Sequence, residues 1–403
     1  MKKQYDVIIV GCGVAGCFTA LHLPEDKDIL MIAKRDLEES DSFLAQGGIC
    51  VLKDEQDYDS FYEDTMRAGH YENRPESVDI MIRSSREVIN ELIAFDVDFN
   101  KINGELAYTK EGAHSTNRIL YHDDITGREI TSKLLAEVKR RSNVTLMSHT
   151  TMIDILCHDN CCDGIVIKTK QGELQPVFAQ NVMWACGGIG GVYENSTNFP
   201  QLTGDALALS LRHNITLEHV DYVQIHPTTL FSKKKERRFL ISESVRGEGA
   251  HLYDKNGNRF VDELLPRDVV TREIHKQMEK DGTEHVWLSF LPIQDMDVTT
   301  RFPNIYRKCL EEGYDITKEW IPVVPAQHYF MGGVHVDSNS HTSMEHLYAA
   351  GETSCNGVHG KNRLASNSLL ESLVFAKKAA LHMVSQEDGK SSQRFAEYLD
   401  MSM

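Results

Sequence analysis

Hydrophobic runs at the start of the chain predict two strands with a helix between them. Residues 5–10 form a short, nearly continuous apolar run, which predicts a buried strand. The sequence GCGVAG follows at residues 11–16, and apolar residues then continue as a predicted helix to residue 23. A second apolar run at residues 28–32 predicts another strand. A strand, a GxGxxG loop and a helix in this order are typical of a βαβ unit that binds a dinucleotide.

The rest of the chain alternates between periodic and irregular segments. Residues 75–95 have the apolar spacing of a long helix with proline at its start, and residues 103–104 (Asn-Gly) predict a tight turn. Short apolar runs broken by glycine-containing turns predict a β-meander over residues 144–185, inserted on the sheet. Residues 220–325 are more charged and less periodic, whereas residues 347–351 predict a strand that a loop and an apolar helix follow.

These segments predict an α/β protein with two domains. A Rossmann-like domain that includes the inserted meander is expected at residues 1–223 and 325–403, discontinuous in sequence. An α+β capping domain is expected at residues 224–324. We expect the active site at the interface of the two domains.

Composition excludes several classes of partner. The chain has 403 residues, of which 41% are hydrophobic, so it can bury large cores and is too apolar to be disordered. No stretch approaches the roughly 20 apolar residues that span a bilayer, and no secretory leader precedes the first strand. We therefore expect a cytoplasmic protein. The formal charge of −17 argues against nucleic acid and anionic membranes as partners. The nine cysteines contain no CxxC pair, which favours reduced structural thiols and no metal site.

Each glycine of the GxGxxG loop has its own expected task. Gly11 makes the tight turn, Gly13 lets the backbone approach a pyrophosphate, and Gly16 allows close packing of the helix. The second strand leads into Lys34 and Arg35, without the acidic residue that would bind a ribose of NAD. The loop therefore predicts that the chain binds a dinucleotide. The missing acidic residue argues against NAD as that dinucleotide.

Beyond the glycine loop, the chain contains an ordered set of short motifs. They are AQGG at 45–48, ACGG at 185–188, TGD at 203–205, QIHPT at 224–228, RGEG at 246–249, PRD at 266–268 and the stretch 351–371. Any one of them could be a structural turn, whereas the ordered set is highly specific. With this set, the chain resembles the flavoprotein family of L-aspartate oxidases, succinate dehydrogenases and fumarate reductases over essentially its whole length.

The resemblance implies that the first domain is an FAD-binding domain. Membrane-bound members carry the flavin covalently on a histidine just ahead of AQGG, and Asp41 occupies that position here, so non-covalent FAD is expected. Backbone amides and Lys34 would offset phosphate charge, while Asp205 and Glu352 can accept hydrogen bonds from hydroxyls. By resemblance, the cofactor-binding residues are Gly11, Cys12, Gly13, Val14, Ala15, Gly16, Lys34, Asp41, Ser42, Phe43, Leu44, Ala45, Gln46, Gly47, Gly48, Asp205, Glu352, Ser368 and Leu369.

The resemblance also implies a site for a small dicarboxylate. The planar fork of arginine suits a carboxylate, and Arg363 matches the family's carboxylate-binding arginine. Arg267 matches the family's catalytic arginine; because arginine is a poor base, Asp268 or Glu248 is expected to assist it. The other substrate-binding residues that the resemblance implies are Glu111, Gln224, His226, Ser242, His328 and Ser366.

Glu111 discriminates among the relatives. Its loop resembles the aspartate oxidase loop in which a glutamate faces the substrate ammonium, where the dehydrogenases have an apolar residue. A carboxylate there would favour aspartate and penalise succinate, because like charges in a closed site repel. Lys110 and Ala113 stand where arginine and glycine are commoner in the family, which puts the geometry of the loop in question.

The resemblance therefore implies oxidation of L-aspartate, with hydride passing from Cα to flavin N5 to give iminoaspartate. Oxygen, forming hydrogen peroxide, or fumarate, forming succinate, would reoxidise the flavin. Iminoaspartate would then feed quinolinate synthase, as the first step of de novo NAD biosynthesis. A C-terminal helical domain that is common in the family is expected to be absent, since the sequence ends at Met403.

Three alternatives stay open at this point. A soluble fumarate reductase shares nearly every motif, and Glu111 is the feature against it. The flavoprotein subunit of a membrane succinate dehydrogenase is disfavoured by Asp41. An FAD-binding module without catalysis is a third possibility, from a different class of protein.

Overall fold

The main sheet of the computed structural model, which describes residues 2–234 and 236–386, is built around the first strand of the chain. This sheet has seven strands, and β8, β2, β1, β11 and β18 run parallel to one another, whereas β10 runs antiparallel to its two neighbours, β11 and β9. In spatial order they are β8 (Val144–Met147), β2 (Ile29–Ile32), β1 (Gln4–Val10), β11 (Leu174–Trp184), β10 (Cys161–Lys168) and β9 (Thr151–His158), while β18 (Leu347–Ala349) pairs with β11.

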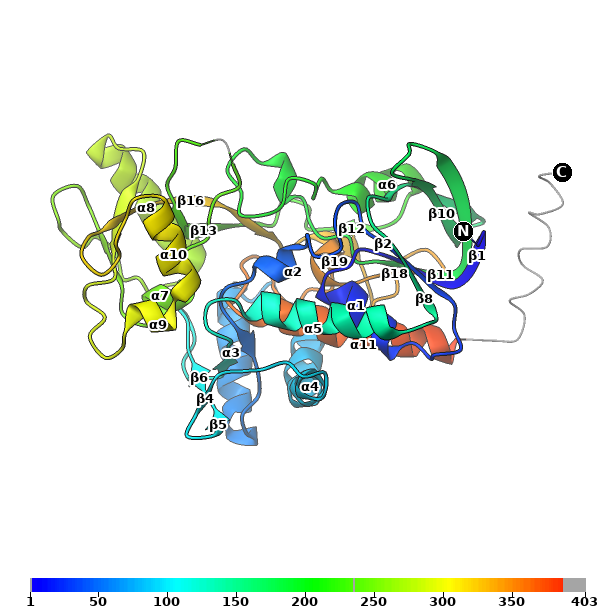
Figure 1. Cartoon of the computed structure of the whole chain (residues 1–403), viewed down its shortest axis with the longest axis horizontal. Helices are drawn as coiled ribbons and strands as arrows, with labels where there is room; N and C mark the ends of the chain where they lie inside the picture. Colours follow the sequence, from blue (N-terminus) through cyan, green and yellow to red (C-terminus); the bar gives the residue numbers. More distant parts are fainter. Residues whose placement is uncertain (1, 235, 387–403) are drawn as a thin grey trace.

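Both faces of this sheet are covered, which explains why β1 is apolar at almost every position. Val7 and Ile9 pack into one hydrophobic cluster with the helices, and Ile8 and Val10 pack into a second cluster on the opposite face. Figure 1 shows α1 (Val14–His22) beside α5 (Thr126–Arg140) and α11 (Asn367–Ser385), which run across the sheet. The first face carries α1 (Val14–His22), α4 (Pro75–Ala94), α5 (Thr126–Arg140) and α11 (Asn367–Ser385), and the second carries α6 (Asp205–His213).

A second, four-stranded antiparallel sheet has its own hydrophobic cluster, which includes Ile241, Val270 and Phe302. It lies at the opposite end of the molecule from β9 and β10 (Figure 1). Its strands are β13 (Val223–Leu230), β16 (Ile321–Phe330), β15 (Val286–Ser289) and β14 (His251–Tyr253); the neighbouring helices are α7 (Glu243–Gly247), α8 (Arg267–Asp281), α9 (Val298–Arg301) and α10 (Pro303–Glu311).

Two long strands, β13 and β16, connect this second sheet to the rest of the chain. The domain boundaries expected at 223/224 and 324/325 both fall inside these strands. The division into an FAD-binding and a capping domain remains a prediction, and residues 387–403 of the expected first domain lie outside the described residues.

Short elements fill the space between the two large sheets. The turn expected at residues 103–104 is confirmed: Asn103 and Gly104 have φ angles of 54° and 86° and join a two-stranded hairpin. The other short elements are α2 (Asp41–Leu44), α3 (Tyr58–Ala68), β3 (Ile49–Cys50), β4 (Lys101–Ile102), β5 (Glu105–Leu106), β6 (Tyr108–Thr109), β7 (Ile119–Leu120), β12 (Leu217–Glu218), β17 (Gly333–His335) and β19 (Ser354–Cys355).

One element of the expected meander is in the wrong place. The strands β9, β10 and β11 do form an antiparallel meander, and β11 continues into the main sheet beside β1. The run at residues 144–147, however, pairs in parallel with β2 at the far edge, because it follows the crossover helix α5. An apolar run predicts a strand but says nothing about which neighbour it pairs with.

Among the residues described, no helix combines the length and the apolar character needed to cross a membrane. All nine cysteines lie within this part of the chain, and the free thiols there include Cys12, Cys17, Cys50, Cys157, Cys186, Cys309 and Cys355.

Candidate functional site

A deep pocket runs from the glycine loop of the main sheet to residues of the second sheet. Its first end is lined by β1, α1 and α2, and its second end by β13, α7, α8 and the segment before α11. We call these the cofactor end and the substrate end. The pocket thus extends between the two sheets, and the active site was expected at the interface of the two predicted domains.

At the cofactor end, the backbone fits only glycine at two of the loop positions. Gly11 has φ +115°, and a Cβ there would lie 2.1 Å from the backbone oxygen of Ala185. A Cβ on Gly16 would lie 2.0 Å from the backbone oxygen of Gly11. Gly16 does not line the pocket, so its contribution is the close packing of α1 on β1. Helix α1 begins at the pocket wall, and the unpaired backbone N–H groups of a first helical turn can bind a phosphate group there.

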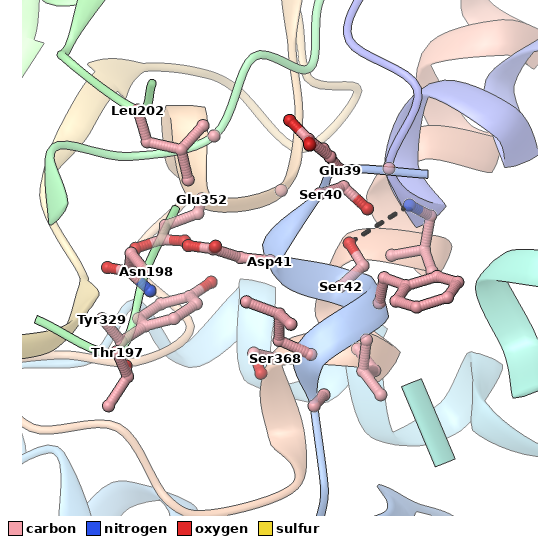
Figure 2. Close-up of a pocket in the computed structure, with 18 of the residues that line it drawn as sticks. Glu39, Ser40, Asp41, Ser42, Thr197, Asn198, Leu202, Tyr329, Glu352 and Ser368 are labelled. Atoms are coloured by element: carbon pink, nitrogen blue, oxygen red, sulfur yellow. Dashed lines mark hydrogen bonds between the residues drawn. The ribbon is translucent and has the colours of Figure 1, made fainter. Parts of the chain in front are cut away.

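Segment 40–48 forms one wall of the cofactor end and carries unused hydrogen-bonding groups. The hydroxyl of Ser42 accepts a hydrogen bond from Val14 N at 3.2 Å, which ties α2 to the start of α1 (Figure 2). Among the described residues, Ser40 Oγ, Asp41 Oδ2 and Gln46 Oε1 are buried without a hydrogen-bond partner. Buried polar atoms of this kind are normally satisfied by a ligand or by ordered water. The wall therefore fits a polar group such as FAD.

Lys34 has a different partner from the one expected. Its ammonium donates to both carboxylate oxygens of Asp205, at 3.0 and 2.9 Å, and to Thr203 Oγ1 at 2.8 Å. Lys34 and Asp205 both line the pocket, but their charges offset each other. A bound phosphate would therefore depend more on backbone amides than on the charge of Lys34.

Two carboxyl groups face each other across the cofactor end. Figure 2 shows the side chains of Asp41 and Glu352 pointing toward one another. Asp41 Oδ1 accepts from Phe199 N at 2.9 Å, and Glu352 Oε1 accepts from Phe330 N at 2.8 Å. Burial raises the pKa of Asp41 to about 7, and burial together with Asp41 raises the pKa of Glu352 to about 8.

The fold thus gathers nearly all of the residues expected to bind FAD around one pocket. Gly16 is the exception. The residues on the pocket wall are Gly11, Cys12, Gly13, Val14, Ala15, Lys34, Asp41, Ser42, Phe43, Leu44, Ala45, Gln46, Gly47, Gly48, Asp205, Glu352, Ser368 and Leu369.

At the substrate end, Arg363 is a buried cation with spare donor capacity. Arg363 is 4% exposed. Its Nη1 donates to Ser368 Oγ at 2.8 Å, and its guanidinium lies 4.4 Å from the centre of the Tyr329 ring. Its Nε has no partner among the described residues. Burial, followed by the nearby charge of Arg267, lowers the pKa of Arg363 to about 10, so it is a cation at neutral pH. An anionic group could bind there without displacing another anion.

His226 and His328 form an edge-to-face pair beside the arginines, with ring centres 5.0 Å apart. Nδ1 of His226 accepts from Thr228 N at 3.1 Å, while its buried Nε2 has no partner within the described residues. Nδ1 of His328 lies 2.7 Å from Thr197 Oγ1. Burial, followed by the charge of Arg267, lowers the pKa of both imidazoles, so both are neutral at pH 7.

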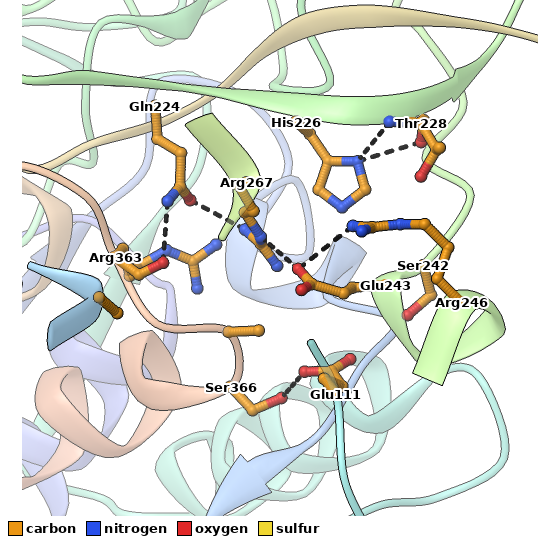
Figure 3. Close-up of polar contacts among 12 residues, drawn as sticks. Glu111, Gln224, His226, Thr228, Ser242, Glu243, Arg246, Arg267, Arg363 and Ser366 are labelled. Atoms are coloured by element: carbon orange, nitrogen blue, oxygen red, sulfur yellow. Dashed lines mark hydrogen bonds and ion pairs between the residues drawn. The ribbon is translucent and has the colours of Figure 1, made fainter. Parts of the chain in front are cut away.

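Arg267 is paired with a glutamate that the sequence analysis did not assign. Its Nε donates to Glu243 Oε2 at 2.5 Å and its Nη1 donates to Gln224 Oε1 at 2.8 Å (Figure 3). Arg246 lies 3.5 Å from the same Glu243 oxygen. Although burial opposes ionisation of Glu243, Arg267 and Arg246 lower its pKa, so the carboxylate is charged.

The two acids expected to assist Arg267 have other partners, and their role remains a prediction. Asp268 lies beside His70, at 3.2 Å, and Glu248 lies 3.4 Å from Arg301. Neighbours in sequence at the start of a helix point in different directions, and Glu243 reaches Arg267 from another element. The only sequence signal for Glu243 was its place next to the RGEG motif, three residues before Arg246.

Gln224 lies behind the pocket wall rather than on it. Its amide nitrogen donates to Asn362 Oδ1 at 2.9 Å and to Arg363 O at 2.8 Å, while its oxygen accepts from Arg267. Gln224 thus holds the two arginines in place. Contact between Gln224 and a substrate, as expected from the sequence, would require a rearrangement of this network.

Glu111 lies on the pocket wall and is only 3% exposed. One carboxylate oxygen accepts from Ser366 Oγ at 2.5 Å and the other accepts from Ser244 Oγ at 2.6 Å. Ser366 Oγ in turn accepts from Gly48 N at 3.1 Å, next to the AQGG motif. Ser242, at the N-cap of α7, also lines the pocket. The loop of Glu111 is pinned at Ala113, which has φ 65° and donates from its backbone N to Leu264 O.

The fold and the pocket together define an FAD-binding flavoprotein. A family model described as an FAD binding domain matches residues 6–369. Within this class, the chain belongs to the L-aspartate oxidase family. It is 51% identical to the L-aspartate oxidase of Clostridium perfringens over 389 residues, which are 96% of this chain and 88% of that protein. It is 48% identical to the L-aspartate oxidase of Clostridium acetobutylicum, over 94% of this chain and 88% of that protein.

Among solved structures, the fold is similar to that of an E. coli quinol fumarate reductase. The TM-score is 0.88 at 27% sequence identity, covering 99% of this chain and 74% of that chain. The parallel sheet and the second sheet are therefore part of a fold that this chain shares with that enzyme.

Proposed function

We propose that this chain oxidises L-aspartate to iminoaspartate with non-covalently bound FAD. When bound, FAD would accept the hydride from Cα and be reoxidised by oxygen or fumarate. The observation that carries the proposal is the position of Glu111, a buried carboxylate on the same pocket wall as the cations Arg267 and Arg363. Such a site offers both signs of charge to a ligand that itself carries an ammonium and two carboxylates.

The side chains divide the recognition of aspartate between them. Arg363, with His226 and His328 in their neutral forms, would bind the carboxylates by charge and hydrogen bonding. Arg267 would add positive charge, and the ionised Glu243 keeps its guanidinium in one orientation. Glu111 would face the substrate ammonium. Succinate lacks that ammonium, so it would leave the Glu111 charge buried and unpaired, which costs several kcal/mol.

The cofactor end would hold FAD through the free N–H groups at the start of α1 and the unpaired polar atoms of segment 40–48. Asp41, and not a histidine, occupies the position just ahead of the AQGG motif, which supports non-covalent binding. As the chain's cellular context, we propose a cytoplasmic enzyme whose iminoaspartate is consumed by quinolinate synthase in NAD biosynthesis.

Anaerobic mixing of the FAD-loaded protein with substrates tests the proposal. We expect L-aspartate to bleach the flavin absorbance, and succinate and D-aspartate to bleach it far more slowly. Bleaching by succinate at a rate equal to that by L-aspartate would instead favour a fumarate reductase or succinate dehydrogenase. A protein that neither compound bleaches would be an FAD-binding module without this activity.

A further inference from the structure

The orientation of Glu111 depends on a serine from a different element of the fold. Ser244 lies on α7, whereas Glu111 follows β6 and Ser366 directly precedes α11. Ser244 Oγ donates to Glu111 Oε1 at 2.6 Å. Figure 3 shows the matching bond from Ser366 to the other side of the same carboxylate. Each oxygen of Glu111 is therefore anchored by a different part of the fold.

A chain of hydroxyl groups extends this anchor to the start of α7. Ser242 Oγ lies 3.2 Å from Ser244 Oγ, and the same Ser242 oxygen caps the helix by accepting from Ser244 N at 3.2 Å. Ser244 is 3% exposed, so water does not compete freely for its hydroxyl. The hydroxyl that reaches Glu111 is thus itself fixed by the helix cap.

Two anchored oxygens limit where Glu111 can direct its remaining lone pairs. A carboxylate has about four acceptor positions, and two of them are occupied by Ser244 and Ser366. The free positions then point in fixed directions toward the pocket. Without the Ser244 hydroxyl, the Glu111 carboxylate could rotate about its Cγ–Cδ bond. Binding of a cation in the pocket would then cost the conformational entropy of fixing the carboxylate again.

From this geometry we infer that Ser244 is a positioning residue that sets the preference of the site for an amino dicarboxylate over the dicarboxylate without an amine. The inference rests on the proposed function, because it assumes that Glu111 faces the ammonium of the substrate. Ser244 acts only through Glu111, so its effect should vanish when Glu111 loses its charge.

The experiment compares Ser244→Ala with wild type, using KM and kcat for L-aspartate and the dissociation constant of succinate from the shift in the flavin spectrum. Ser244→Ala should raise KM for L-aspartate about 10-fold, as expected for the loss of one hydrogen bond to a charged group, and change kcat less. Succinate binding should change less than about twofold. Ser244→Thr, which keeps the hydroxyl, should restore the KM of wild type.

Two controls separate positioning from a general loss of structure. Ser289→Ala removes another buried hydroxyl, on β15 of the second sheet, which accepts a hydrogen bond from Leu291 N, and should leave the selectivity unchanged. In a Glu111→Gln background, Ser244→Ala should change KM for L-aspartate less than about twofold.

An equal loss for L-aspartate and succinate, or the same 10-fold loss in the Glu111→Gln background, would overturn the role of Ser244. The failure of wild type to react with L-aspartate would refute the proposed function, and with it the role of Ser244. A normal wild-type reaction combined with an unselective Ser244→Ala variant would refute the positioning role alone.

Discussion

The two ends of the pocket are built in different ways. The cofactor end is formed by backbone N–H groups, by glycines that leave no room for a side chain and by two carboxyls with raised pKa values. The substrate end is formed by buried arginines whose positions depend on partners from distant parts of the sequence. A site made of backbone tolerates many side chains, whereas a site made of buried charges fails when one partner is lost. Substitutions at the two ends should therefore differ in size and in kind.

The largest effect is expected for Arg363→Gln at the substrate end. This change removes a buried cation that would pair with a substrate carboxylate, so kcat/KM for L-aspartate should fall about 10³-fold, or about 4 kcal/mol. Steady-state kinetics of protein with unchanged FAD content would measure it. The exposed Arg272→Gln on α8 is the matched control and should behave like wild type. A loss below 10-fold for Arg363→Gln would remove its carboxylate-binding role.

A smaller effect is expected for Glu243→Gln, which keeps the size of the side chain but leaves Arg267 without its ionic partner. Breaking a buried ion pair costs about 3 kcal/mol, so kcat/KM should fall about 100-fold. Asp268→Asn tests the partner that the sequence suggested and should cost less than about threefold. The losses in kcat/KM of the two variants are compared. A larger loss for Asp268→Asn than for Glu243→Gln would show that Asp268, and not Glu243, is the partner on which Arg267 depends.

The cofactor end should respond through pH rather than through lost contacts. Burial raises the pKa of Asp41 from 3.8 to about 7. Protonated Asp41 therefore contributes its full stabilisation of the folded apoprotein only below about pH 4, and this stabilisation is lost as the pH rises to about 7. Asp41→Asn cannot ionise, and its amide oxygen can still accept from Phe199 N. The variant should exceed wild type in free energy of unfolding by about 4 kcal/mol at pH 8 and by little at pH 4.

Urea unfolding of the apoproteins at both pH values measures this difference. Asp59→Asn, which changes an exposed carboxyl of α3, is the control and should follow wild type at both values. A constant difference between Asp41→Asn and wild type across the range would show that ionisation of Asp41 has no part in it.

The same contrast explains how much the sequence could predict. The glycine loop, the long helix at Pro75–Ala94 and the strand at Leu347–Ala349 follow from local patterns and are confirmed. The residues that the family resemblance implied for FAD binding lie together on one pocket wall, apart from Gly16, and their contacts with FAD remain a prediction. Gly16, which packs rather than lines the pocket, had its packing task foreseen from its position in the loop.

The parts that could not be predicted depend on pairs of residues far apart in the chain. Nothing near Arg267 in the sequence points to Glu243, and no motif links Thr197 to His328 or Ser244 to Glu111. Tertiary packing also determines that Gln224 lies behind the pocket wall and that the strand Val144–Met147 pairs with β2. Local periodicity carries no information about such partners.

The central claim is that Glu111 selects the amine of L-aspartate, and the dissociation constants of L-aspartate and succinate for wild type and Glu111→Gln test it most directly. The dissociation constant of L-aspartate comes from the concentration dependence of the rate of anaerobic flavin bleaching, and that of succinate comes from the shift in the flavin spectrum. Glu111→Gln should weaken L-aspartate about 10-fold, or about 1.4 kcal/mol, and leave succinate unchanged or bound more tightly. An equal loss of affinity for both ligands would contradict the account.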